Sequence, residues 1–137
     1  MILFNYENDF SLAQEEAVSN WIIEALEAEG FDYEDINFIF CNDEYLLKLN
    51  KKYLNHDTFT DIISFDYSIG NVVSGDIFIS TERVSDNANK YQVSFENELH
   101  RVIIHGILHF MGYNDKSEDE TLLMREKENQ AIKELKF

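Results

Sequence analysis

Residues 105–115 of the chain are HGILHFMGYND, an apolar segment with histidines at its first and fifth positions. Side chains four positions apart lie on one face of an α-helix, about 5–6 Å apart, so His105 and His109 can bind one metal ion. Gly112 can adopt the left-handed conformation that commonly ends a helix. Asp115 follows closely, where it can fold back as a third ligand or act as a turn residue. The segment therefore predicts a metal centre built on one helix.

Gly106 lies directly after the first of these histidines. Glycine inside a helix costs about 1 kcal/mol relative to alanine, so its presence calls for a reason. We expect the missing side chain to leave room beside His105 for a metal ion, its water or a substrate group.

Hydrophobic periodicity on both sides of this segment predicts further strands and helices. Strands are expected at 2–6, 36–41, 61–67 and 76–79, the last two forming an antiparallel hairpin. Helices are expected after capping residues, which are Ser11 (with Gln14 in a capping box), Asn42, Ser80 or Thr81, Ser94, and Ser117 (with Glu120). Gly75 suggests a bulge or a close backbone approach.

The predicted order of elements favours an α+β fold, in which a single small mixed sheet packs with about five helices. Nothing in the sequence divides it, so residues 1–137 are expected to form one domain. The last helix is expected to begin after Ser117 and to run to the C-terminus through Leu122, Leu123, Ile132 and Leu135.

The charge balance is strongly acidic, with 27 acidic and 11 basic residues and a formal charge of −16. Such a charge argues against a broad electrostatic surface for nucleic acid or anionic lipid. Lys48, Lys51 and Lys52 form the only compact basic group, so RNA binding would need a local cationic pocket. A single cysteine, Cys41, and the lack of an apolar run of about 18 residues predict a cytoplasmic protein without membrane contact.

Three segments resemble motifs of one known family. Residues 105–113 are similar to the HGxLHxxGY signature of the YbeY family, metal-dependent endoribonucleases that act in ribosomal RNA maturation. Residues 49–65 resemble its LNxxYRxxDxxTDVLSF run, and residues 75–80 (GDIFIS) resemble its GDIxIS strand. The resemblance implies the family fold, a small mixed sheet packed with helices, with a zinc-hydrolase-like metal helix.

The chain departs from the family motifs at two positions. The signature usually ends in Tyr-Asp-His, whose histidine is the third metal ligand, whereas this sequence has Asp115 at that place. Leu54 stands where the upstream run has an arginine, a credible phosphate clamp. The resemblance then implies either that the family mechanism is altered or that a neighbouring cation supplies the charge, the candidates being Lys51, Lys52 and Arg101.

Two histidines and a carboxylate with an open position form a known catalytic zinc pattern, although a carboxylate also admits harder ions such as Mn²⁺. We therefore expect one Zn²⁺ per chain, or another divalent ion, bound by His105, His109 and Asp115. The general base is open, and the candidates are Asp61, Asp76 and His56.

The expected function is that of a metal-dependent, single-strand-specific endoribonuclease in 16S (small-subunit) ribosomal RNA processing and ribosome maturation. Its partners would be a ribosomal RNA precursor and a ribosomal or ribosome-associated protein. One alternative is a zinc metallopeptidase-like hydrolase, although Gly106 occupies the position of the HExxH glutamate. Another is a non-catalytic ribosome-associated factor that binds a metal.

Overall fold

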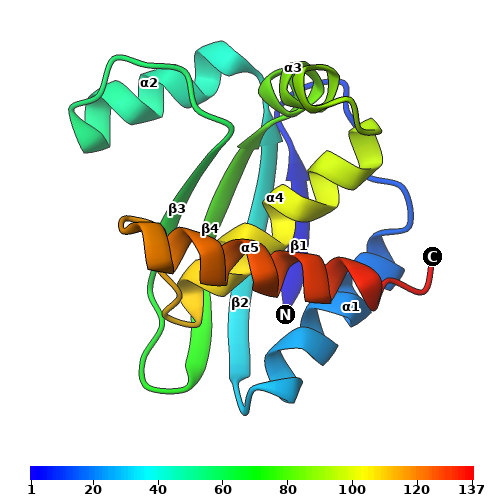
Figure 1. The fold of residues 1–137 in the computed structure, drawn as a ribbon. Coiled ribbons are helices and arrows are strands. Elements are labelled where there is room, and N and C mark those ends of the chain that lie inside the picture. The colour runs from blue at the N-terminus through cyan, green and yellow to red at the C-terminus, as the bar shows by residue number, and fades with distance from the viewer.

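One four-stranded sheet with the order β1-β2-β4-β3 organises the computed structural model, which describes residues 1–137 (Figure 1). The strands are β1 (Ile2–Tyr6), β2 (Asp32–Cys41), β3 (Ile62–Asp66) and β4 (Val72–Ser80). Strands β1, β2 and β4 are parallel neighbours, and β3 pairs antiparallel with β4. The predicted mixed sheet and its hairpin are confirmed, and β2 begins four residues earlier than expected.

Five helices surround the sheet, as the α+β prediction required (Figure 1). They are α1 (Glu15–Ala28), α2 (Asp43–Leu54), α3 (Thr81–Tyr91), α4 (Phe95–Phe110) and α5 (Glu118–Lys133). None of them has the length and apolar character that crossing a bilayer requires.

Helix α4, which carries both histidines, packs closely against one face of the sheet. A Cβ added to Gly106 would lie 3.0 Å from the Cδ1 atoms of both Ile62 and Ile77. The absence of a side chain therefore lets the helix approach β3 and β4. The expectation that Gly106 leaves room for a metal or substrate is wrong, because this position faces the sheet rather than the histidine rings.

The opposite face of the sheet carries α2. Leu46 of this helix is buried with Cys41 and Ile63 in a small second cluster, and Phe78 packs against it. Successive strand residues point to opposite faces. Residues 62 and 77 therefore face α4, whereas residues 63 and 78 face α2.

Four of the five predicted helix caps are confirmed. The side chains of Asn42, Ser80, Ser94 and Ser117 each accept a hydrogen bond from a backbone N–H in the first turn that follows. The capping box at Ser11 and Gln14 is wrong, because Gln14 is left-handed and its side chain makes no capping bond. The segment before α1 is instead held by the hydroxyl of Tyr6, which accepts a hydrogen bond from the N–H of Leu12.

The predicted last helix is confirmed as α5, but it ends at Lys133 and does not reach Leu135. Leu122 and Leu123 are 64% and 43% exposed, whereas Met124, Glu128 and Ala131 are buried. The buried residues are spaced by four and three positions, which is the period of one helix face. The sequence contains two candidate apolar faces on this helix, and packing against α4 selects the one that carries Glu128.

Gly75 is predicted to be intolerant of a side chain. A Cβ at this position would lie 2.3 Å from the carbonyl oxygen of Phe65 and 2.7 Å from Cζ of Phe110. Because the first contact is backbone of the paired strand, Gly75→Ala should lower the free energy of unfolding by about 1–3 kcal/mol. Urea denaturation measures this effect, with Ser85→Ala on the exposed side of α3 as the control. A variant as stable as the wild type would contradict the close approach.

Candidate metal centre and adjoining cavity

Three side chains converge at the C-terminal end of α4. The Nε2 atoms of His105 and His109 lie 3.0 Å apart, and each lies 3.4 Å from Oδ2 of Asp115. The turn that follows α4 makes this possible, because Gly112 has a positive φ of 101° and reverses the chain toward the helix. The structure thus brings together the three residues that the sequence suggested as ligands.

The spacing of these atoms fits a bound cation. Zn–N distances of about 2.0–2.1 Å place two ligands of a tetrahedral ion about 3.3 Å apart. The three observed separations, 3.0, 3.4 and 3.4 Å, lie near this value. Atoms that each carry a lone pair repel at such distances unless a proton or a metal ion lies among them.

Glu128 of α5 determines which nitrogen of His105 is available. Its Oε2 lies 2.6 Å from Nδ1 of His105, and its side chain is only 6% exposed. An ionised carboxylate can only accept hydrogen bonds, so Nδ1 of His105 carries the proton. The lone pair of Nε2 is then directed toward His109 and Asp115. A carboxylate behind a ligating histidine is a common arrangement in metal sites.

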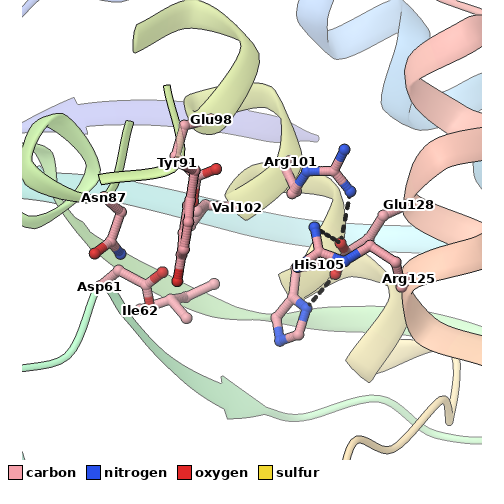
Figure 2. Close-up of a pocket in the computed structure, with 10 residues that line it drawn as sticks. All are labelled: Asp61, Ile62, Asn87, Tyr91, Glu98, Arg101, Val102, His105, Arg125 and Glu128. Carbon is pink, nitrogen blue, oxygen red and sulfur yellow. Dashed lines mark hydrogen bonds and ion pairs between the residues drawn. The ribbon is translucent and has the colours of Figure 1, made fainter. Parts of the chain in front are cut away.

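Two arginines surround the same carboxylate (Figure 2). Nη1 of Arg101 donates to Oε1 of Glu128 at 3.0 Å, and its Nη2 donates to Asn129 at 2.9 Å. Arg125 lies 3.5 Å from Oε1 of Glu128, and its side chain is 58% exposed. The guanidinium of Arg101 is therefore occupied by contacts within the protein, whereas the guanidinium of Arg125 is exposed to solvent.

The pKa values of this pair follow from the same contacts. Burial alone would raise the pKa of Glu128, but its hydrogen bonds to His105 and Arg101 outweigh burial and lower it. Burial would likewise lower the pKa of His105, but the hydrogen bond to Glu128 and the charges of Glu128, Asp115 and Asp61 together outweigh burial and raise this pKa. Glu128 is therefore held as a carboxylate that favours a positive charge on or beside the His105 ring.

A cavity of about 220 Å³ adjoins this centre between α3, α4, α5 and the start of β3. His105, Arg101, Arg125 and Glu128 line one part of it, and Asp61 lines another (Figure 2). Burial raises the pKa of the Asp61 carboxyl, and the nearby His105 opposes this only in part. Of the three proposed bases, Asp61 is the one that shares a cavity with His105.

The other two candidate bases lie elsewhere. Asp76 is adjacent in β4 to Ile77, which faces α4, so its side chain lies on the opposite face of the sheet, where it accepts a hydrogen bond from Asn37. His56 and Leu54 line a separate cavity beside the loop that precedes β3. Neither Asp76 nor His56 is brought to the metal ligands.

Leu54 stands where the family motif has an arginine, and the structure shows where the neighbouring cations lie. Lys51 is half-exposed and paired with Asp57 at 3.3 Å, and Lys52 lies over the ring of Tyr53. Arg101 is bound to Glu128. The exposed cation beside His105 is instead Arg125, which the sequence analysis did not consider.

Glu128 and Arg125 are the two site residues that sequence reasoning missed. The sequence does contain a pattern that points to Glu128. This acidic residue lies four positions after Met124 and three before Ala131, so all three share the buried face of the helix. A charged residue in such a stripe is rarely buried without a partner. The exposed Leu122 and Leu123 form a second apolar face on the same helix, which obscures this pattern in the sequence.

Comparisons with known proteins agree with the motifs. The family model described as Endoribonuclease YbeY matches residues 3–136. Endoribonuclease YbeY of Flavobacterium johnsoniae is 58% identical over 132 residues, covering 96% of this chain and 95% of that protein. The protein of the same name from Christiangramia forsetii is 57% identical over 131 residues, covering 96% and 92%.

A solved structure supports the same assignment. The solution structure of a Thermotoga maritima protein matches with a TM-score of 0.72 and 27% identity, covering 98% of this chain and 89% of that one. The resemblance indicated by residues 49–65, 75–80 and 105–113 is confirmed, and the chain belongs to the YbeY endoribonuclease family.

Proposed function

We propose that this protein is a zinc-dependent, single-strand-specific endoribonuclease that acts in the cytoplasm on the precursor of small-subunit ribosomal RNA. Membership of an endoribonuclease family supports RNA as the substrate. The observation that carries the metal dependence is the convergence of His105, His109 and Asp115, with Glu128 holding His105 in the ligating tautomer.

The roles of the residues follow from their positions. His105, His109 and Asp115 would hold the ion, which supplies Lewis-acid polarisation of a phosphoryl oxygen when bound. Arg125, exposed beside His105 and held by Glu128, would bind a phosphate of the RNA backbone. Asp61, in the same cavity, would accept a proton from the attacking nucleophile.

The formal charge of −16 limits how this protein can bind RNA. Exposed charges farther away than about 8 Å are screened at physiological salt, so the groups inside the cavity dominate the local field. Arg101 and Arg125 place two guanidinium groups there, but Asp61, Glu98 and Glu128 add three carboxyl groups, so a phosphate would depend on Arg125 and on the bound ion rather than on a positive lining. We expect weak, strongly salt-dependent binding of isolated RNA, and a ribosome-associated protein that presents the RNA would strengthen it.

A cleavage assay tests the proposed function. Zinc-loaded protein is incubated with small-subunit ribosomal RNA precursor, the same RNA annealed to a complementary strand, and a peptide library. Cleavage of the single-stranded RNA that a chelator abolishes and added Zn²⁺ restores is the expected result. Cleavage of peptides, or RNA cleavage that persists in the chelator after the metal has been removed, would refute the proposal.

Asp61→Asn should lower kcat for RNA cleavage by about 10²–10⁴-fold while leaving zinc content unchanged. A base must be deprotonated to act, and burial raises the pKa of Asp61, so wild-type activity should rise with pH above the usual range of an aspartate. In the Asp61→Asn variant, this rise of activity with pH should be absent. pH–rate profiles measure the effect, and Asp57→Asn in the exposed loop before β3 is the control. An unchanged profile would exclude Asp61 as the base.

A further inference from the structure

We propose that the cavity beside the candidate metal centre binds one nucleobase of the RNA strand and that Glu98 recognises the exocyclic amino group of this base. The inference rests on the proposed function and specifies how its substrate is recognised. It concerns a part of the cavity that contains none of the proposed metal ligands.

Glu98 is the first observation. This residue lies in the first turn of α4, is only 6% exposed, and lines the cavity. Its carboxyl makes neither an ion pair nor a hydrogen bond, although Arg101 lines the same cavity and is instead bound to Glu128 and Asn129. The carboxyl oxygens of Glu98 are therefore free to accept a hydrogen bond from a ligand that enters the cavity.

The part of the cavity that contains this carboxyl also suits a planar ring. Tyr91, the last residue of α3, is 55% exposed and lines the cavity. Asn87 precedes it by one helical turn and also lines the cavity, and Val102 supplies an apolar surface. Single-stranded RNA is commonly bound by stacking of splayed bases on aromatic side chains, with polar groups at the base edges.

The cavity has two chemically different parts (Figure 2). Asn87, Tyr91 and Asp61 lie on one side of the view, and Arg101 and Arg125 lie on the other side, around His105 and Glu128. A nucleotide has the same division, with an anionic phosphate and a neutral base that carries hydrogen-bond donors. The cations would face the phosphate and Glu98 would face the base.

Size and the placement of possible ligand atoms disfavour other occupants. A volume of about 220 Å³ lies below the ~300–1,000 Å³ of pockets for drug-sized ligands and therefore suits one base rather than a longer fragment. A second metal ion is disfavoured, because the acidic and histidine atoms close enough to share an ion are those of His105, His109 and Asp115, and neither Asp61 nor Glu98 is among them.

Glu98 should discriminate among bases in either protonation state. Burial raises the pKa of its carboxyl. Ionised or neutral, the carboxyl retains an oxygen that accepts a hydrogen bond. Cytosine, adenine and guanine each carry an amino group that donates one, whereas uracil and hypoxanthine carry none. The cavity should therefore prefer CMP to UMP and GMP to IMP.

The test is a titration of the zinc-loaded protein with CMP, UMP, GMP and IMP. Binding is measured from the changes in backbone amide chemical shifts in NMR spectra. We expect the dissociation constants of UMP and IMP to exceed those of CMP and GMP by about fivefold or more, with shifts at residues 87, 91 and 98. Glu98→Gln should abolish the ratio, because the amide presents a donor as well as an acceptor. Glu96→Gln, an exposed acid in the same turn, should preserve it.

A second variant, Tyr91→Leu, keeps the proposal testable if Glu98→Gln fails to fold. Tyr91→Leu should weaken binding of all four nucleotides by about fivefold or more and leave the ratios intact, since stacking is tolerant of base identity. Equal affinities in the wild type, or shifts confined to other surfaces, would overturn the inference. RNA cleavage without this preference would refute the base site alone. The preference without RNA cleavage would refute the proposed function and leave the base site standing.

Discussion

His109→Ala and Asp115→Ala should each reduce bound zinc from one ion per chain to near zero and abolish RNA cleavage. Each substitution removes one of three converging ligand atoms, which lie 3.0–3.4 Å apart. Loss of a direct ligand should exceed the ~10–100-fold loss of affinity that removal of an outer-shell partner causes. Metal analysis of purified protein and a competition titration with a chromogenic chelator measure the effect.

The fold should survive both substitutions. Asp115 is 41% exposed and lies in the turn after α4, and the His109 side chain is 28% exposed, so neither contributes greatly to the core. Circular dichroism of the metal-free proteins should therefore match the wild type. Asp119→Ala, an exposed acid in the first turn of α5, is the matched control and should retain its zinc. Full zinc content in both ligand variants would refute the metal centre.

Glu128→Gln should weaken both zinc binding and folding. The amide still offers an oxygen to Nδ1 of His105, but its NH₂ group faces the guanidinium of Arg101 and leaves that cation unpaired. Breaking one side of a buried ion pair costs about 3–5 kcal/mol. Loss of a carboxylate behind a ligating histidine should reduce zinc affinity by about 10–100-fold. Urea denaturation of the metal-free protein and chelator competition measure the two effects separately.

Arg101→Met separates the two roles of Glu128. This variant removes the Arg101 ion pair but keeps the contact between Glu128 and His105, so folding should weaken while zinc affinity changes less than in Glu128→Gln. Glu126→Gln, an exposed acid on the same helix, should change neither. If Glu128→Gln binds zinc as tightly as the wild type, Glu128 acts only in packing and in pairing with Arg101.

Much of the fold was predictable because the signals are local. Capping by Asn42, Ser80, Ser94 and Ser117 depends on side chains a few residues from the N–H groups that they bind. The hairpin of β3 and β4 likewise follows from two β-rich segments joined by a turn. The start of α1 was not predictable in this way, because the Tyr6 hydroxyl, six residues upstream, holds Leu12 in place of a cap at Ser11.

The sequence by itself determined the helix with histidines at i and i+4 and the glycine turn that returns Asp115 to them, since both depend on neighbours within eleven residues. Only the tertiary structure decided that Glu128 lies behind His105 and that Arg125 and Asp61 share the cavity. These positions depend on the rotation of α5 about its axis and on the strand from which each loop departs. Two apolar faces of α5 compete in the sequence, and the free energy of packing against α4 selects between them.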